Sequence, residues 1–287
     1  MRMRELCRNH TRPHTVNHAF VLGPLALPYA LLLLLAAVVS SLLIGTRIGR
    51  ARGVDVEPAL WKALLVGLVA ARLAFIWEFR SAYLAAPLTV VDIRDGGWNA
   101  TAGFIAAWLY VLSLYRRRPE LRKAMQAALL TGSFVWLAGA IALALVLPGP
   151  ARTPLPALAF ASLDNPEPLP LARFKGKPTV VNLWATWCPP CVREMPVLQQ
   201  AQRDRPDVHF VFLNQGESAA RVGAWLQARN LGLHNVLLDE TRSASAAFQQ
   251  SALPTTLFFD ADGLLVTLRI GELSAATLAE RLAATRR

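Results

Sequence analysis

Four long apolar segments in the first half of the chain constrain its fold more than any other feature. They span residues 20–44, 59–79, 98–115 and 124–147. Each approaches or exceeds the roughly 17–25 residues that a helix needs to cross a bilayer. Several tryptophans and tyrosines lie near their ends, at the level of the aromatic belts of membrane proteins. A soluble core helix can look like one such segment, but four in succession predict an all-α transmembrane bundle of four spans.

The charges of the chain support this interpretation. Residues 1–150 contain 16 Lys and Arg against 7 Asp and Glu, a net charge of +9, whereas residues 151–287 contain 14 against 12, a net charge of +2. The basic residues of the first half flank the apolar segments, which indicates membrane topology and argues against nucleic-acid binding. Three cysteines are too few for a disulfide scaffold.

The loops between the segments predict an orientation. The loops after the first and third segments carry the basic residues Arg47, Arg50, Arg52, Arg116, Arg117, Arg118, Arg122 and Lys123. The positive-inside rule places these loops in the cytoplasm, so both termini lie outside. The Arg-rich residues 1–19 favour the opposite orientation.

The composition also suggests limits for the parts of the chain. We expect a polar tail at residues 1–19, a four-helix transmembrane domain at 20–147, a Pro-rich linker at 148–157 and a second domain at 158–287. The tail places three histidines at helical spacing near a lone cysteine, a pattern that can bind metal. Pro13 interrupts it and terminal segments are often disordered, so we expect no metal site. The residues of that pattern are Cys7, His10, His14 and His18.

The second domain contains two cysteines at the start of a predicted helix. A β-rich apolar run, residues 179–183, leads into Cys188-Pro-Pro-Cys191, and a helix-forming run follows. Two thiols at this spacing can close a small disulfide ring, and the positive end of the helix favours a thiolate. We expect Cys188 at the exposed mouth of the turn and Cys191 more shielded. A zinc site would need four ligands, and only His209 and His234 lie nearby. A purely structural disulfide is the other alternative.

These residues resemble a known family. Val180-Val-Asn-Leu-Trp-Ala-Thr, followed by Trp187-Cys-Pro-Pro-Cys191, is similar to the TlpA/ResA branch of the thioredoxin superfamily, as is Ser251-Ala-Leu-Pro-Thr-Thr-Leu-Phe-Phe-Asp-Ala-Asp-Gly263. The likeness covers roughly residues 157–287. It implies an α/β thioredoxin-like fold and a membrane-anchored thiol-disulfide oxidoreductase without a cofactor.

The resemblance also implies roles for individual residues. Cys188 would be the nucleophile and Cys191 the resolving thiol, with a redox-active Cys188–Cys191 disulfide. Glu194, one helical turn after Cys191, would assist proton transfer, since Asn182 stands where cytosolic thioredoxins have an aspartate. A solvated surface carboxylate is the alternative for Glu194.

Three further residues would form the substrate platform of that family. Trp187 would contact the substrate, a cis Pro254 would pack on the dithiol, and the backbone of Leu253 would pair with the substrate chain. Trp184 packs behind Trp187 or is a simple core residue.

Periodicity and turn residues predict the remaining elements of the second domain. We expect a first hairpin and three helices between strands, a final hairpin, and a last helix capped by Ser274. The predicted strands are residues 158–163, 169–174, 179–185, 208–214, 255–260 and 264–270, and the predicted helices are 190–203, 217–230, 241–249 and 275–285.

The membrane half has a resemblance of its own. Residues 20–27, 71–75 and 95–104 look similar to the first half of prolipoprotein diacylglyceryl transferase. The His-Gly-Gly of that family is replaced by Thr101-Ala-Gly103, so the transferase reaction is not expected, although a lipid-binding groove remains an alternative. Arg72 lies inside the second span, which makes it either a functional-site candidate or a packing residue.

No cysteine lies between residues 8 and 187, so the membrane half cannot pass electrons by thiol exchange. A separate membrane donor of the DsbD/CcdA type would supply them. We expect a multi-pass protein of the bacterial inner membrane, with its dithiol in the periplasm, an oxidising compartment. It would reduce protein disulfides, including those of cytochrome c maturation. The alternatives are a disulfide oxidant or isomerase, or a lipid- or lipoprotein-binding membrane protein.

Overall fold

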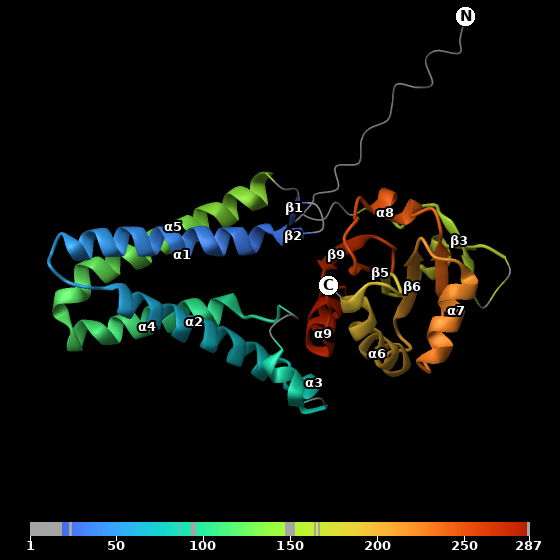
Figure 1. Ribbon diagram of the computed structural model, residues 1–287, viewed down its shortest axis with the longest axis horizontal. Helices are drawn as coiled ribbons and strands as arrows, with labels where there is room; N and C mark the ends of the chain where they lie inside the picture. The colour runs from blue at the N-terminus through green and yellow to red at the C-terminus, as the bar shows by residue number, and fades with distance from the viewer. Residues whose placement is uncertain are drawn as a thin grey trace, which may run out of the picture.

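The computed structural model describes residues 19–22, 25–85, 87–92, 96–146, 153–163, 165 and 167–285. Cys7 and the histidines of the expected tail lie outside these residues, as do residues 148–152 of the expected linker and Asp95. Figure 1 shows an elongated helical part beside a globular α/β part.

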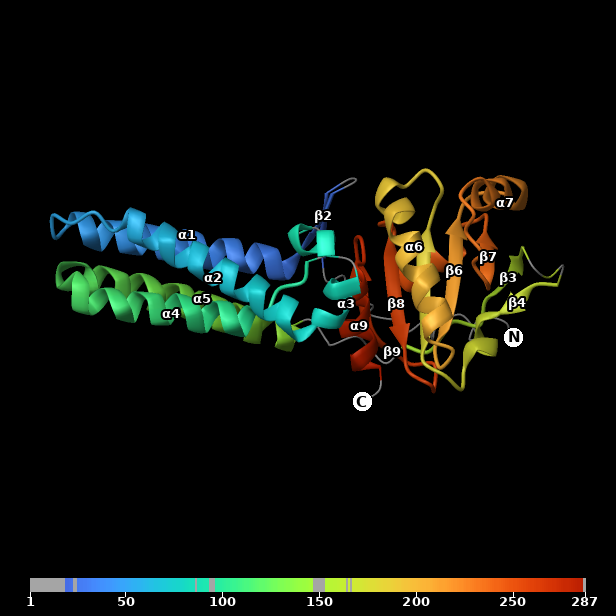
Figure 2. The ribbon, with the colours of Figure 1, turned by 90° about the horizontal axis from the view of Figure 1, so that it is seen from below.

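Four helices run side by side along the long axis of the helical part (Figure 2). They are α1 (Tyr29–Arg50), α2 (Glu57–Glu78), α4 (Ala100–Arg117) and α5 (Arg122–Val146). α1 packs on α5, and α2 packs on α4. The loops with the basic clusters lie at the end far from the globular part (Figure 1), which keeps their charges on one side.

Small residues allow the helices to approach closely. A Cβ on Gly67 of α2 would lie 3.1 Å from the carbonyl oxygen of Gly103 in α4, and a Cβ on Gly103 would lie 2.8 Å from that of Gly67. A Cβ on Gly132 of α5 would clash with the hydroxyl of Ser41 in α1, which donates to the carbonyl of Ala128 at 2.9 Å. Small residues at helix crossings are typical of membrane bundles, where close packing replaces the hydrophobic effect.

Among the described residues, three helices are long and apolar enough to cross a membrane: Leu31–Arg50, Glu57–Glu78 and Pro119–Val146. The four predicted spans are therefore supported only in part. α4 is shorter, and its last turn carries Arg116 and Arg117, which lower its apolar character.

The first predicted span needs a correction at its start. Residues 20–22 and 25–28 belong to an antiparallel pair of strands, β1 (Ala19–Leu22) and β2 (Leu25–Pro28), and the helix begins only at Tyr29. Pro28 explains the boundary, because a proline restricts the preceding residue to extended backbone and cannot donate to a helix hydrogen bond. The helix then continues to Arg50, beyond the predicted end.

Short elements connect the helices of the bundle. α3 (Arg80–Ala85) and the 3₁₀ turn η1 (Pro87–Val91) follow α2 at the end nearest the globular part, and η2 (Pro119–Leu121) links α4 to α5.

The globular part is built on a seven-stranded sheet with the order β4-β3-β7-β6-β5-β8-β9. β5, β6 and β7 are parallel, and the other pairs are antiparallel. The strands are β3 (Ala159–Ser162), β4 (Leu169–Pro170), β5 (Thr179–Trp184), β6 (His209–Gln215), β7 (Val236–Asp239), β8 (Thr255–Phe259) and β9 (Leu265–Ile270).

Helices cover both faces of this sheet because adjacent strand residues point to opposite sides. Val180 packs into a cluster with α6 (Pro189–Asp204), α7 (Ala219–Ala228) and α9 (Ala275–Ala284). Val181 packs on the other side with α8 (Ser243–Phe248) and the 3₁₀ turn η3 (Leu171–Phe174). The result is the thioredoxin-like α/β sandwich that the sequence predicts.

Two strand predictions need correction. The predicted strand 169–174 is a strand only to Pro170, after which η3 turns Leu171 and Phe174 into the core, three residues apart. β7 was not among the predicted strands, and its four residues are all buried between β6 and β3. Such a short apolar run shows no alternation that would reveal a strand.

Candidate functional site

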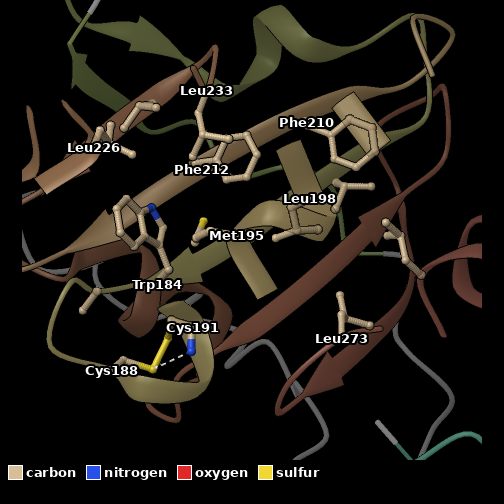
Figure 3. Close-up of a cluster of buried hydrophobic side chains, with 14 of the residues drawn as sticks. Trp184, Cys188, Cys191, Met195, Leu198, Phe210, Phe212, Leu226, Leu233 and Leu273 are labelled. Atoms are coloured by element: carbon tan, nitrogen blue, oxygen red, sulfur yellow. Dashed lines mark hydrogen bonds between the residues drawn. A yellow bond between two sulfur atoms is a disulfide. The ribbon is translucent and has the colours of Figure 1, made fainter. Parts of the chain in front are cut away.

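The two cysteines lie at the junction between β5 and α6. Cys188 is the N-cap of α6, and its sulfur accepts a hydrogen bond from the backbone N–H of Cys191 at 3.3 Å. The two residues form a disulfide with an Sγ–Sγ distance of 2.07 Å (Figure 3). Pro189 and Pro190 occupy the first helical positions, where a missing N–H leaves no hydrogen bond unmade.

Both cysteines are buried, and Cys191 is the more shielded of the two, as predicted. Cys188 is 4% exposed and Cys191 is 0% exposed, so the expectation of an exposed Cys188 is wrong for the disulfide form. The cause is packing: both residues belong to the buried cluster that contains Trp184 and Met195 (Figure 3). The neighbouring Trp187 is 53% exposed and is the large apolar side chain beside the disulfide that faces solvent.

Leu253 and Pro254 reach the same region from the strand side. Their peptide bond is cis, as predicted, and Pro254 is buried. Leu253 packs against the cluster that contains both cysteines. The carbonyl of Pro254 accepts the N–H of Gly271 at 2.9 Å, which ties this turn to the end of β9.

Glu194 is a buried acid under the site and not a solvated carboxylate, with 0% exposure. Its Oε1 accepts from Nδ2 of Asn182 at 2.8 Å, and its Oε2 accepts from the N–H of Leu273 at 3.0 Å. Burial raises the pKa of Glu194 to about 8, against the opposing effect of these two donors. At spacing i, i+3, Glu194 lies on the α6 face that also carries Cys191.

Asn182 links this acid to the sheet. Its Nδ2 also donates to Oγ1 of Thr256 on β8 at 3.0 Å. The position that holds an aspartate in cytosolic thioredoxins thus supplies a donor here, and the carboxyl group comes from α6.

Sequence reasoning missed a second buried acid, Glu217. It accepts hydrogen bonds from the N–H and the hydroxyl of Thr186 and from Nδ2 of Asn214, and it pairs with Arg221 at 2.9 Å. Burial raises the pKa of Glu217, but these three hydrogen bonds and the charge of Arg221 outweigh it, so the pKa lies below its usual value. Glu217 thereby anchors the turn that carries Trp187.

A signal for Glu217 was present in the sequence. β5 and β6 are parallel neighbours, with Trp184 opposite Asn214. Polar residues that follow two such strands lie together at the carboxyl edge of the sheet, which is where sites form in α/β folds. Thr186 and Glu217 both follow their strands in this way.

Trp184 is a core residue, at 0% exposure, and its ring centroid lies 5.3 Å from that of Trp225. In the part of the chain that the structure describes, no group of three or more His, Cys, Asp or Glu could hold a metal ion. The site therefore offers sulfur chemistry with a buried acid beside it.

In the bundle, Arg72 is buried and its guanidinium donates to backbone carbonyls of residues 89–97. Glu78 accepts instead from Nδ2 of Asn99, at 3.4 Å. Arg72 lines an apolar groove of about 340 Å³ with Leu65, Leu68, Val69, Leu73, Ile76, Val90 and Trp98.

Comparison with known proteins places the similarity in the second half. Residues 150–282 match the Redoxin family. The thiol-disulfide oxidoreductase ResA of Bacillus subtilis is 30% identical over 116 residues, which are 40% of this chain and 64% of that protein. The thiol:disulfide interchange protein DsbE of Pseudomonas fluorescens is 28% identical over 131 residues, which are 46% of this chain and 72% of that protein.

Among solved structures, a thioredoxin-family thiol:disulfide interchange protein from Chlorobium tepidum is 27% identical, with a TM-score of 0.42 over 47% of this chain and 97% of that one. The chain spans slightly less than two thirds of the ResA protein it matches, at 64%.

Proposed function

We propose that this chain is a membrane-anchored thiol-disulfide oxidoreductase that reduces protein disulfides on the outer side of the plasma membrane. The observation that carries the proposal is the Cys188–Cys191 disulfide at the start of α6, with buried Glu194 one turn below. The match of residues 150–282 to the Redoxin family and the similarity of the chain to ResA and DsbE proteins support the same chemistry.

The reaction is a two-electron exchange. In the reduced protein, the Cys188 thiolate attacks one sulfur of a substrate disulfide and forms a mixed disulfide, while the other substrate sulfur leaves as a thiolate. Cys191 then loses its proton to the carboxylate of Glu194 and attacks Cys188. The substrate leaves with two thiols, and the protein is left with its internal disulfide.

The local structure fits these roles. The N–H of Cys191 and the positive end of α6 stabilise charge on the sulfur of Cys188. Exposed Trp187, together with Leu253 and the cis Pro254, forms the platform on which a substrate chain would bind.

The proposed topology has four spans, a periplasmic globular domain and both termini outside. The exposed apolar side chains of α4, Ile105, Leu109 and Leu112, support its place in the lipid with the other three helices. The far loops present exposed arginines and Lys123, which suits the cytoplasmic side. A tag on the loop at Pro119 should be shielded in intact cells, whereas a tag after Arg287 should be accessible; the reverse pattern would refute the orientation.

The electrons come, in this proposal, from a separate membrane donor of the DsbD/CcdA type, because the bundle contains no cysteine between residues 8 and 187. The substrates would be exported proteins with disulfides, including apocytochrome c. A disulfide oxidant or isomerase would use the same residues. Equilibration with glutathione distinguishes a reductant from an oxidant or isomerase. A reduction potential of the dithiol far below about −200 mV identifies a reductant, and a higher one identifies an oxidant.

The decisive experiment is substrate trapping by the full chain. Cys191→Ser should accumulate mixed disulfides with exported proteins through Cys188, because the resolving step is blocked. The double variant with Cys188→Ser should accumulate none. Equal yields from both variants would refute the proposed nucleophile.

A second candidate function, lipid binding by the bundle, rests on the apolar groove beside Arg72. The groove is lined mostly by apolar side chains of α2, together with Val90 and Trp98. Lipid should co-purify with a chain in which Cys188 and Cys191 are both serine, and it should be lost when Leu68→Trp is added. This result would support lipid binding by the groove. Equal lipid content in Leu68→Trp would exclude this groove.

A further inference from the structure

Described residues of the two parts of the chain meet at a contact patch with two contacts. Phe75 and Tyr83 of the helical part form a buried cluster with Ala276 of α9, and Figures 1 and 2 both show α3 beside α9. A second contact joins Gly96, ahead of α4, to Arg269 of β9. A Cβ on Gly96 would lie 2.7 and 2.8 Å from the two terminal nitrogens of Arg269. The guanidinium therefore lies against the backbone of Gly96, and an added Cβ at this position would displace it.

Arg72 shapes the membrane side of this patch. Its guanidinium donates to the carbonyl oxygens of Gly97 at 2.9 Å, Val90 at 3.1 Å and Asp92 at 2.8 Å. The ring of Phe75 packs directly on Gly97. An arginine inside an apolar helix is costly unless its donors are satisfied. Here those donors hold the backbone near Gly97 against α2.

The globular side of the patch leads to the active site through one short segment, residues 269–273, which we term the strap. The strap begins at Arg269 in β9 and ends at Leu273, whose N–H donates to Oε2 of Glu194 at 3.0 Å. The same few residues thus touch the membrane half at one end and the buried acid at the other.

The strap also supplies the charges that face the acid. The polar and charged groups around the carboxyl come from β5, the strap and α6: Asn182, the N–H of Leu273, Arg269, and Glu272 with its partner Arg193 at 2.6 Å. After burial, which raises the pKa of Glu194, the donors Asn182 and Leu273 lower it, Glu272 raises it, and Arg269 lowers it. Arg269 is therefore the cation in this set that also contacts the membrane half.

We propose that Arg269 is a positioning residue through which the membrane half controls the proton-transfer acid Glu194. Gly96 holds the guanidinium in place, and the charge of Arg269 favours the carboxylate that accepts the proton of Cys191. This inference rests on the function proposed above, because it assigns a regulator to the acid of that reaction.

The test is the pH profile of disulfide exchange by the full chain in detergent. Exchange needs the carboxylate, so its rate should rise with pH through the pKa of Glu194. Arg269→Gln should move this inflection to higher pH, by on the order of half a unit for the loss of one nearby charge. Arg269→Lys retains the charge, so its inflection should lie close to that of the parent chain.

The membrane side is tested by Gly96→Ala, with Gly53→Ala as the matched control. Both glycines have positive φ, +66° and +69°, but Gly53 has nothing within 4 Å of its added Cβ, and it lies in the loop at the far end of the bundle. Gly96→Ala displaces the guanidinium of Arg269 from its present position, so it should weaken the effect of Arg269 on Glu194 and shift the inflection in the same direction as Arg269→Gln. In the Arg269→Gln background it should add no further shift, as expected for coupled residues.

Two failures can be distinguished. If the parent chain exchanges disulfides and Glu194→Gln removes the inflection, while Arg269→Gln or Gly96→Ala leaves it unmoved, the coupling is refuted and the proposed function stands. If the parent chain does not exchange disulfides at all, the proposed function fails first. A shift of equal size in Gly53→Ala would also refute the coupling, because it would show a general effect of strain in the bundle.

Discussion

The buried Nδ2 of Asn182 donates a hydrogen bond to Oε1 of Glu194 at 2.8 Å, beside the disulfide. In the proposed mechanism the proton of the resolving thiol goes to the carboxyl group of Glu194, because the amide of Asn182 cannot accept one. The amide orients that carboxyl group, while burial keeps its pKa near 8. A group with a pKa close to the working pH can both accept and return a proton.

Glu194→Gln should slow disulfide exchange and remove the rise in rate through pH 8. General bases commonly contribute about 10²–10⁴-fold, so we expect a loss of at least about tenfold above pH 8 and a smaller loss at pH 6. The measurement is the rate of reduction of a protein disulfide from pH 5 to 9. Superimposable profiles for mutant and parent would remove Glu194 from the mechanism.

Glu194 should also make stability depend on pH. Its pKa rises on folding from 4.5 to about 8, so the folded state binds more protons between these values and stability falls as pH increases. The slope for one such group is at most about 1.4 kcal/mol per pH unit. Urea denaturation of the oxidised chain should show this decline, and Glu194→Gln should flatten it. An unchanged slope in Glu194→Gln would contradict the buried, protonated state.

Glu217 should act on stability in the opposite direction. Its pKa falls on folding from 4.5, so its contribution is present above that value and is lost as the pH falls through the folded pKa. Glu217→Gln places an amide donor against the donors Thr186 and Asn214 and should destabilise the chain by about 1–3 kcal/mol at pH 7. Denaturation midpoints of parent and mutant at pH 7 and below pH 4 measure this loss of stability. An equal loss at both pH values would argue against an ionised Glu217.

Trp187→Ala should weaken recognition of protein substrates without impairing the sulfur chemistry. The ring is exposed in the free protein and would be covered by a bound chain, and such aromatic anchors contribute about 2 kcal/mol or more. We expect KM for a protein disulfide to rise about thirtyfold, with little change in the reaction with glutathione disulfide. A parallel loss for both substrates would mean that Trp187 serves the structure of the turn instead.

Local signals of the sequence predict much of this site. The order of strand, Cys188-Pro-Pro-Cys191 and helix needs only neighbouring residues, and Ser274 caps α9 as predicted, accepting from the N–H of Thr277 at 3.2 Å. The burial of Cys188 and the anchor from Glu217 to Thr186 depend on the packing of distant segments, which no local pattern reports.

The same limit explains the errors in the bundle. The apolar run before Tyr29 has the composition of a membrane helix, but Pro28 divides it between a pair of strands and α1. The partners of Arg72 are backbone carbonyls that any sequence would provide. A search of the sequence for a charged partner therefore could not find them.

The most direct test of the account is a redox titration of the full chain carrying Cys7→Ser, followed by alkylation and mass measurement in glutathione buffers of increasing reducing strength. We predict one reversible transition in which Cys188 and Cys191 gain two alkyl groups together, with no species carrying one. A disulfide that stays closed at every potential, or two thiols that react independently, would contradict a redox-active pair at the start of α6.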